Sequence, residues 1–415
     1  MKEIIEYLVH CRVCGSVDTE EFLRLPQMPM TGDFVPTDGS RVEFKADIPL
    51  CVCRNCWTCQ TLHNVDFSTY YEDYEYSVGA SGTAARFMDS IASHVTSSYF
   101  TEGEQLRILE IGSGDGRQLE SFRKLGHAVM GYEPSAPLAE LARARGIDSI
   151  CGLFRRESLN DLPATFRHVD IILMSFTLDH IPDPVGAMDC CRKLLDPNRG
   201  LLVIENHDLE KIFERGEFCL FEHEHSIYLT AATAQRLLDR CGFDLIAVNP
   251  LPEAITRANS LVLVASPKAP VGGRTILSSI GLGYEGAIEW YQNGAETIRT
   301  SIARFDSYVS SCVNQGITLA GYGAGGRGVM TLAASRVASS LEYLVDQNPK
   351  GEGILAPSSR VPVVGLEHVR IHPVDRIIVF SFGYMEEIQD DLAQRGIPAG
   401  ALVSIADIWS EKAIA

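Results

Sequence analysis

Residues 107–116 read Arg-Ile-Leu-Glu-Ile-Gly-Ser-Gly-Asp-Gly, and residues 131–135 read Gly-Tyr-Glu-Pro-Ser. The first stretch predicts an apolar strand that enters a glycine-rich turn, and the second predicts the end of the following strand. Gly112 and Gly114 would let the backbone approach a ligand closely, and the helix after the turn would present free N–H groups to it. Glu133 falls where a carboxylate can accept hydrogen bonds from both hydroxyls of a ribose. Together the two stretches predict a βαβ unit that binds a nucleotide.

Strand-length and helix-length segments alternate on both sides of this unit. Strands are expected at 106–111, 128–132, 169–174, 200–205, 245–248 and 261–265, and helices at 84–95, 118–125, 136–145, 185–195 and 231–241. Such alternation is typical of a parallel sheet with helices on both faces. The expected fold class is therefore α/β, with a doubly wound, Rossmann-like sheet in the middle of the chain.

The length of 415 residues exceeds what one hydrophobic core usually holds, so several domains are expected. Boundaries are expected to give domains at 1–70, 71–268 and 276–415. The first segment is rich in cysteines and turn residues, and it looks too small to fold without a stabilising cross-link such as a bound metal ion. After a linker at 267–275, a helix at 288–313 should lead into a second Rossmann-like α/β domain with strands near 317, 341–345 and 376–380.

Composition and charge narrow the class of partner. The chain is 46% hydrophobic and 22% charged, with 36 basic and 54 acidic residues and a net charge of −18. A strongly acidic protein repels nucleic acid and anionic membranes, so neither is an expected partner. Apolar runs fall short of the ~20 residues of a membrane span, and the N-terminus lacks a signal-peptide pattern. We therefore expect a cytoplasmic, monomeric protein that acts on a small molecule.

Two Cys-x-x-Cys pairs, Cys11/Cys14 and Cys53/Cys56, lie in the first sixty residues. Each pair can offer two thiolates to one tetrahedral ion, and four thiolates leave no open coordination position. This pattern predicts a structural zinc ion rather than a catalytic one. Cys59 is an alternative fourth ligand, because Cys56-x-x-Cys59 forms a competing pair.

The order of these features resembles that of one enzyme family. The stretch at 110–116 is similar to motif I of S-adenosylmethionine (SAM)-dependent methyltransferases. The cysteine pairs, His180-Ile-Pro-Asp at 180–183, Glu224-His225, Gly-Tyr-Gly-Ala at 321–324 and Val-Asp-x-Asn-Pro at 345–349 follow in an order similar to that of the three-domain C-methyltransferases of deoxysugar biosynthesis. The resemblance covers nearly the whole chain. It implies a zinc-binding N-terminal domain, a methyltransferase core and a C-terminal Rossmann-like domain.

The resemblance also implies a reaction. SAM would be the methyl donor and a nucleotide-linked 4-keto-6-deoxy sugar the acceptor, methylated on a ring carbon beside the ketone, usually C3. His225 matches the family's base, Glu224 its companion carboxylate and His180 the histidine near the keto oxygen. Tyr76 resembles a tyrosine that reaches the pocket from the N-terminal side.

The donor site can be assigned in the same way. Gly112, Ser113 and Gly114 should face the methionine and ribose parts of SAM. Glu133, followed by Pro134, should bind the ribose. Phe154 is expected to stack on the adenine and Phe176 to wall the pocket. Both aromatic residues could equally be core residues.

The segment Glu222-His223-Glu224-His225 could supply a base, even without the family resemblance. If the segment is extended, both histidines lie on one side of it. Imidazole has an ordinary pKa of about 6.5, which suits proton removal near neutral pH. An exposed polar loop and a two-histidine metal site at His223 and His225 are the alternatives. A third metal ligand is not obvious in the sequence.

Three positions depart from the family pattern, and all are expected to touch the acceptor. Glu222 stands where a tyrosine is usual, and residues 323–328 read Gly-Ala-Gly-Gly-Arg-Gly instead of Gly-Ala-Pro-Ala-Lys-Gly. Gly383 replaces a common asparagine beside Tyr384. Arg327 is expected to be available to phosphate, with the C-terminal domain closing over the nucleotide-sugar.

Other functions stay open from the sequence. Gly321, Gly323 and Gly326 match a dinucleotide fingerprint, and Asp346 falls where a ribose-binding acid would lie. An NAD-dependent oxidoreductase or epimerase is therefore an alternative to methyl transfer. A carbon acid other than a sugar is an alternative acceptor.

Overall fold

The computed structural model describes residues 5–39, 41–65, 82–268, 275–347 and 353–413. The chain divides into two compact units. The first unit contains residues 1–20, 52–209 and 225–286, and the second contains residues 21–51, 210–224 and 287–415. The three-domain division expected from the sequence stays a prediction.

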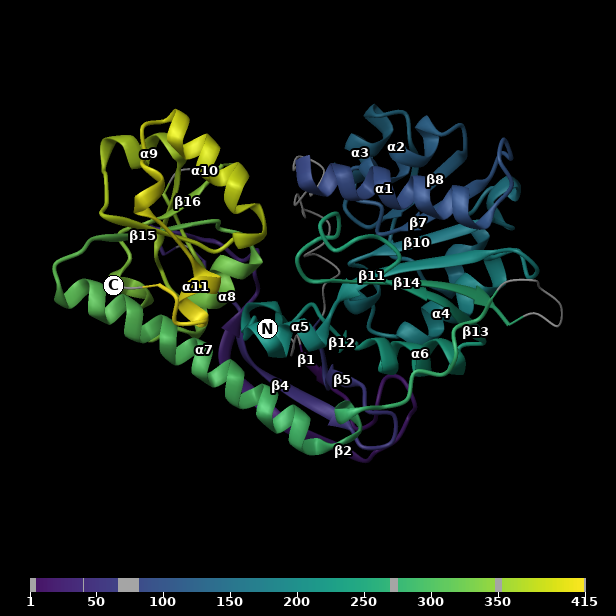
Figure 1. The fold of residues 1–415 in the computed structure, drawn as a ribbon, viewed down its shortest axis with the longest axis horizontal. Helices are drawn as coiled ribbons and strands as arrows, with labels where there is room; N and C mark the ends of the chain where they lie inside the picture. The colour runs from purple at the N-terminus through teal and green to yellow at the C-terminus, as the bar shows by residue number, and fades with distance from the viewer. Residues whose placement is uncertain (1–4, 40, 66–81, 269–274, 348–352, 414–415) are drawn as a thin grey trace. The chain divides into compact units, whose positions relative to one another are not determined.

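The first unit is built on a seven-stranded sheet of order β13-β14-β11-β10-β7-β8-β9 (Figure 1). Its strands are β7 (Arg107–Ile111), β8 (Ala128–Glu133), β9 (Asp148–Cys151), β10 (Ile171–Ser175), β11 (Leu201–His207), β13 (Phe243–Val248) and β14 (Ser260–Pro267). One expectation was wrong, because β14 runs antiparallel to both β11 and β13. The short loop at 249–259 explains this orientation, since a parallel pair needs a crossover of a dozen or more residues.

Alternate side chains of the strands point to two separate cores. Ile108 and Ile171 face α1 (Gly82–Tyr99), α2 (Arg117–Lys124) and α3 (Ala136–Ala144) on one side of the sheet. Leu109 and Ile172 face α4 (Pro184–Leu194) and α6 (Ala231–Arg240) on the other. Figure 1 shows these two helical layers. Burial on both faces explains why the strands read as continuous apolar runs.

The cysteine-rich segment packs on the second of these cores. Strand β1 (Ile5–Tyr7) pairs with β6 (His63–Val65), and β5 (Cys59–Thr61) pairs with β12 (Ile227–Tyr228). Strands β1 and β6 form a two-stranded sheet of their own, whereas β5 and β12 belong to a four-stranded sheet of order β12-β5-β4-β2, with β2 (Thr19–Pro29) and β4 (Lys45–Cys53). The buried Arg12 guanidinium donates hydrogen bonds to the carbonyl oxygens of Thr61 (2.9 Å), His63 (2.6 Å) and Pro182 (2.9 Å). Arg12 thereby ties the N-terminal segment to the loop that precedes α4.

The second unit contains another seven-stranded sheet, of order β20-β19-β15-β16-β18-β17-β3. Its strands are β3 (Val35–Pro36), β15 (Leu319–Tyr322), β16 (Leu344–Asp346), β17 (Ile354–Leu355), β18 (Pro362–Gly365), β19 (Arg376–Val379) and β20 (Leu402–Ser404). Its helices are α7 (Ile288–Asn314), α8 (Gly326–Ala334), α9 (Leu366–Ile371), α10 (Met385–Gln394) and α11 (Ile405–Trp409), and α5 (Leu209–Arg215) begins at the boundary between the units. Strand β3 pairs antiparallel with β17, more than three hundred residues away.

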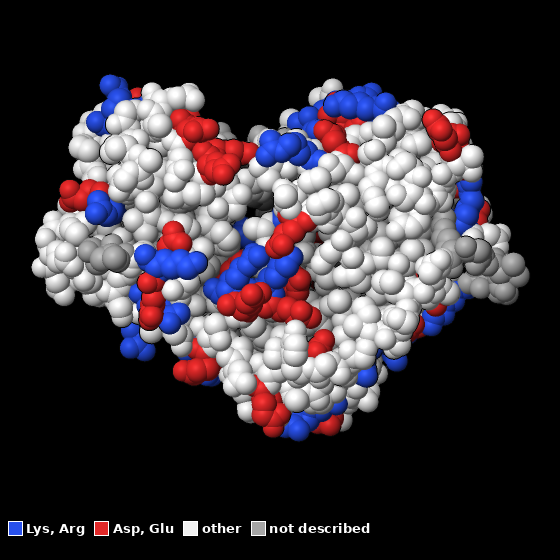
Figure 2. Space-filling model, viewed as in Figure 1, with Lys and Arg blue, Asp and Glu red and all other residues white. Residues whose placement is uncertain are grey.

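Surface charge and helix hydropathy are relevant to the expected lack of nucleic-acid and membrane partners. On the face drawn in Figure 2, basic and acidic side chains are interspersed. Among the helices that the structure describes, none combines the length and the apolar character needed to cross a bilayer.

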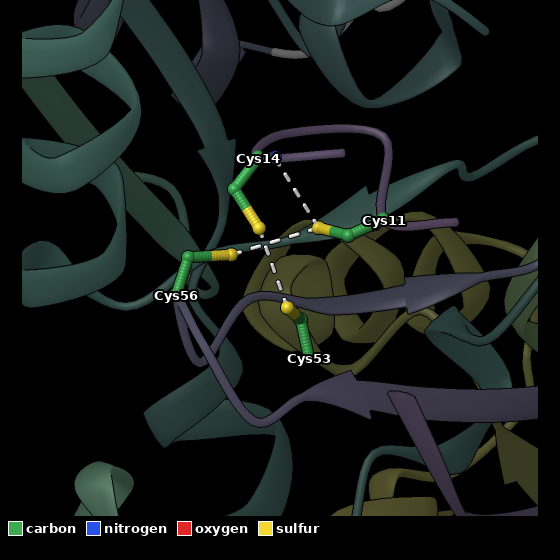
Figure 3. A group of neighbouring side chains, drawn as sticks. All are labelled: Cys11, Cys14, Cys53 and Cys56. Carbon is green, nitrogen blue, oxygen red and sulfur yellow. Dashed lines mark hydrogen bonds between the residues drawn. The ribbon is translucent and has the colours of Figure 1, made fainter. Parts of the chain in front are cut away.

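The four predicted zinc ligands converge (Figure 3). The sulfur atoms of Cys11, Cys14, Cys53 and Cys56 all lie within 4.8 Å of one another, with Cys11–Cys56 at 3.6 Å and Cys14–Cys53 at 3.5 Å. A tetrahedral zinc with bonds of 2.3 Å would separate its sulfurs by about 3.8 Å. The Gln60 side-chain amide (3.1 Å) and the Val13 backbone N–H (3.4 Å) donate hydrogen bonds to the Cys11 sulfur. The group fits a zinc ion, and Cys59 lies outside it in β5.

Removal of one cysteine ligand should release this metal and unfold its surroundings. Cys53→Ser should lower bound zinc from one ion per chain to none, because three thiolates and a hydroxyl hold zinc far more weakly. Cys11, Val13, Cys53 and Cys56 belong to the core that covers the sheet, so the variant should also melt at a lower temperature. Metal analysis and thermal unfolding measure both effects. Cys59→Ala is the matched control, and retention of zinc by Cys53→Ser with loss in Cys59→Ala would contradict the assignment.

Candidate functional site

The glycine-rich turn after β7 has the backbone that a nucleotide-binding turn requires. Gly112, Gly114 and Gly116 have φ angles of 72°, 53° and 77°, in the left-handed region that favours glycine. A Cβ atom at Gly112 would lie 2.3 Å from the hydroxyl oxygen of Thr177. The turn therefore packs against the segment that follows β10. A Cβ atom at Gly131 would similarly meet the Ser113 hydroxyl at 2.3 Å.

Glu133 is fixed at the end of β8 by two backbone groups. Gly114 N–H donates to one carboxylate oxygen and Ser135 N–H to the other, each at 2.8 Å. Burial raises the pKa of Glu133, while these hydrogen bonds act against the rise. Each oxygen of an ionised carboxylate can accept a second hydrogen bond. The carboxylate thus remains able to accept ribose hydroxyls beside Pro134, which is partly buried.

Several acidic side chains are buried near the carboxyl ends of the central strands of this sheet. Glu110 is only 2% exposed, and burial raises its pKa well above the ordinary value. The negative charges of Glu133, Asp115 and Glu205 act in the same direction, and Arg257 opposes them. Arg257 forms a buried ion pair with Glu205. Arg145 likewise pairs with Asp115 at 3.0 Å, so Glu110 and Glu133 are the acids of this group without an ion pair among the described residues.

The two aromatic residues assigned to the donor pocket have different surroundings. Phe154 is partly buried, and its ring meets Tyr132 edge-on at 5.5 Å. The Phe176 ring lies 4.7 Å from the guanidinium carbon of Arg257 and 4.6 Å from the His207 ring. Phe176 has a φ of 47°, so its backbone is held in the left-handed region at the end of β10.

His225 lies among other imidazoles in the first unit. Its ring centre is 4.7 Å from that of His180, at the end of the short 3-10 helix η4 (Leu178–His180), and 5.2 Å from that of His207, the last residue of β11. Burial, and then the neighbouring His225, lower the pKa of His180 well below its usual range. His180 is therefore neutral at neutral pH. His223, by contrast, belongs to the second unit and bonds the Met28 carbonyl at 3.0 Å.

Asp179 and His207 are site residues that the sequence analysis missed. One ligand-type atom each from Asp179, His207 and His225 lie within 4.8 Å of one another. Asp179 is 1% exposed, and burial raises its pKa to about 7. Asp179 directly precedes His180, and His207 ends a strand beside β10. These two positions are the only signals in the sequence that the residues lie near His225.

Glu222 and Glu224 lie in the second unit. Glu224 accepts a hydrogen bond from the Thr31 hydroxyl at 2.9 Å. Glu222 is buried, and a Cβ atom at Gly326 would meet its carboxylate at 2.6 Å, so Glu222 abuts the glycine-rich turn before α8. Tyr76 lies outside the described residues.

Arg327 and Tyr384 also have protein neighbours in the second unit. The Arg327 guanidinium lies 3.9 Å from the Glu217 carboxylate and 5.6 Å from the ring centre of Phe382. Tyr384 is partly buried at the start of α10. The Asp346 carboxylate accepts a hydrogen bond from Ala324 N–H at 2.9 Å, much as Glu133 does from Gly114.

Sequence comparisons match three consecutive parts of the chain. A profile described as "Putative zinc binding domain" matches residues 11–71, "Methyltransferase domain" matches residues 84–248, and "C-methyltransferase C-terminal domain" matches residues 265–404. Together these matches account for most of the chain.

Individual proteins are similar to different extents. The C-methyltransferase NovU of Streptomyces niveus is 26% identical over 404 residues, which cover 94% of each chain. A ubiquinone biosynthesis O-methyltransferase of Xanthomonas oryzae pv. oryzae is 31% identical over 99 residues, 23% of this chain and 41% of that one. The solved CcbJ methyltransferase of Streptomyces caelestis has a TM-score of 0.35 and 16% identity, covering 49% of this chain and 96% of that one.

The methyltransferase match includes the glycine-rich turn after β7, and the zinc-binding match includes the four converging cysteines. SAM is the cofactor, and zinc is the structural metal. The protein is a SAM-dependent C-methyltransferase.

Proposed function

We propose that the enzyme methylates a ring carbon, C3, next to the ketone of a nucleotide-linked 4-keto-6-deoxy sugar. His225 would remove the proton from that carbon, and the resulting enolate carbon would attack the methyl group of SAM in line. The observation that carries this proposal is the contact between the donor turn and the segment that holds the histidines. Methylation of a carbon acid other than a sugar is the alternative acceptor chemistry.

The contact joins two parts of one chemical site. Gly112 packs against Thr177, and Thr177 accepts a backbone hydrogen bond from His180 at 3.0 Å. His180 in turn packs on His225. The donor turn and His180 follow the carboxyl ends of the parallel strands β7 and β10, and His207 ends β11, whereas His225 comes from the segment before β12. Open α/β sheets bind their ligands at this end of the strands. A base packed on His180 and a methyl donor on the neighbouring strand end could hold the acceptor carbon between them.

The local charge supports a cationic donor. SAM supplies an electrophilic methyl group on a positively charged sulfonium. Glu110 and Glu133 are buried with Asp115 and Glu205 nearby. In a buried site such charges interact strongly with a bound cation. We propose that they favour SAM over its neutral thioether product.

His225 and His180 could divide the work of making the enolate. A neutral imidazole has one nitrogen that accepts a proton and one that donates a hydrogen bond. His225 would accept the proton from carbon. Because the low pKa of His180 keeps its ring neutral, His180 could donate one hydrogen bond to the ketone oxygen where negative charge develops.

Acceptor binding would fall to residues outside this base group. We propose that Glu224 supports the base segment, since its carboxylate is already oriented by Thr31. Glu222, Arg327 and Tyr384 would recognise the nucleotide-sugar, and Tyr76 would contribute from the N-terminal side. The pairing of Arg327 with Glu217 implies that a phosphate would compete with an existing ion pair. NAD-dependent chemistry in the second unit remains the alternative, because Asp346 accepts a hydrogen bond from the glycine-rich turn as a ribose-binding acid would.

Replacement of the proposed base should separate proton removal from donor binding. His225→Gln should lower turnover by about 10²–10⁴-fold, because a glutamine amide cannot accept a proton. Exchange of the C3 hydrogen with D2O, followed by NMR in the presence of S-adenosylhomocysteine, measures proton removal without methyl transfer. A panel of 4-keto-6-deoxy nucleotide sugars and labelled SAM then identifies the acceptor.

The matched control is His223→Gln, two residues away and bonded to Met28 rather than to the imidazole group. The folded fraction of His223→Gln should exchange the C3 hydrogen with D2O at the wild-type rate. Wild-type exchange in His225→Gln with unchanged SAM affinity would exclude His225 as the base.

Donor binding should release a proton from Glu110. Burial raises the pKa of Glu110 well above its ordinary value, so the free enzyme keeps this carboxyl protonated to a higher pH than an exposed glutamate. A bound sulfonium favours the carboxylate, lowers that pKa and expels up to about one proton. SAM affinity should therefore rise with pH through the titration of Glu110. Calorimetry in buffers of different ionisation enthalpy measures the release, which should be smaller for S-adenosylhomocysteine and lost in Glu110→Gln. Equal release by that variant would contradict the assignment.

A methyl group at the donor turn should block SAM. Gly112→Ala brings a Cβ atom against Thr177 and forces an unfavourable φ, so SAM affinity should fall by at least about tenfold. Gly126→Ala is the control, because Gly126 has a φ of 92° but open space around its Cβ position. The control should lose about 1 kcal/mol of stability without loss of SAM affinity. Equal affinities in the two variants would show that Gly112 does not approach the donor.

A further inference from the structure

We propose that Asp179, His207 and His225 form a second metal site, separate from the cysteine site, which takes a divalent transition-metal ion of the zinc class. Binding of the ion would withhold His225 from proton removal and inhibit the enzyme reversibly. The inhibitory consequence rests on the proposed function of His225, whereas the binding of metal does not.

Three separate segments bring the ligands together. Asp179 comes from η4, His207 from the end of β11 and His225 from the segment before β12. One ligand-type atom of each lies within 4.8 Å of the others. Two imidazole nitrogens and one carboxylate oxygen are a common set for zinc, iron, cobalt and nickel ions. Three protein ligands also leave positions open for water or for an acceptor oxygen.

The Asp179 carboxylate is the second observation that points to a cation. It is 1% exposed, and within the described part of the chain neither of its oxygens has a hydrogen-bond partner. A buried carboxylate is normally hydrogen-bonded, paired or bound to a metal. A cation between Asp179 and the two imidazoles would satisfy it.

Backbone hydrogen bonds fix the positions of these ligands. Ser226 N–H donates to the Asp179 carbonyl at 2.6 Å, which ties η4 to the residue after His225. The Thr61 hydroxyl donates to the His225 carbonyl at 3.1 Å. A site that is held in place before binding loses less entropy when the ion enters.

The surrounding charge is favourable as well. Glu205, two residues before His207, acts on Asp179 as a like charge, and Arg257 pairs with Glu205. Because Glu205 is already paired with Arg257, Asp179 is the carboxyl group of this cluster that is left to bind a cation.

The ion would compete directly with base chemistry. A neutral imidazole has one free electron pair, which can bind either the metal or the substrate proton. No covalent bond breaks when the metal enters, and water leaves the ion as the nitrogen binds. A chelator that removes the ion would restore the free base.

Metal stoichiometry and cobalt spectroscopy test the site on the full-length enzyme with zinc retained by its cysteines. Added Co2+ should bind as one further equivalent with weak d–d absorption and without the intense thiolate-to-cobalt band of a sulfur site. Asp179→Asn and His207→Ala, checked for folding by circular dichroism, should weaken this equivalent by at least about tenfold. His168→Ala is the matched control, since His168 is exposed outside the group, and it should keep the equivalent.

Zinc titration of methyl transfer completes the test. Inhibition that EDTA reverses in wild-type and His168→Ala enzyme, but that is weakened in His207→Ala, supports the proposal. Only the cysteine-bound metal in the wild-type enzyme, or an undiminished second equivalent in both ligand variants, would overturn it. A second equivalent without inhibition would retain the metal site and count against His225 as the base.

Discussion

The hydrogen bonds that Gly114 and Ser135 donate to Glu133 hold together the carboxyl ends of β7 and β8. They satisfy a charge that is almost completely buried. They also fix the turn that brings backbone close to a ligand, and Gly112 on this turn packs against Thr177. The geometry of the turn that we propose binds the donor thus follows from the need to satisfy one carboxylate inside a sheet with two apolar faces.

The same sheet buries acidic side chains near the carboxyl ends of its strands. Glu110, Glu205 and Asp179 are buried at or just beyond strand ends, and Arg257 is the basic group that acts on Glu110 and pairs with Glu205. Buried acids without equal numbers of basic partners lower stability unless a cation compensates them. On the proposed placement of the donor, its sulfonium would supply that charge, and the same carboxylates would then affect both function and stability.

Sequence patterns predicted the elements whose signal is local. The motif at 107–116 led to the turn, the alternating apolar segments led to the helices and most strands, and cysteine spacing selected the four sulfurs that converge. Three features depended on distant pairings that leave no local pattern. These were the pairing of β14 with β11, the approach of Asp179 and His207 to His225, and the pairing of β3 with β17. Each arises where strand ends or edges meet, and single-sequence periodicity carries no information about which ends are neighbours.

The placement of β3 has a consequence for exchanging parts between related enzymes. Val35 and Pro36 complete the edge of the second unit's sheet, and the backbone N–H of Ser358 donates to the Glu43 carboxylate at 2.7 Å. A chimera spliced at the linker before α7 would give the recipient a carboxyl-terminal half from one parent and its bordering strand from the other. The seam of such a hybrid would run through a hydrogen-bonded sheet edge. Recombination would therefore need to carry residues 21–51 together with the carboxyl-terminal half as one inheritable block.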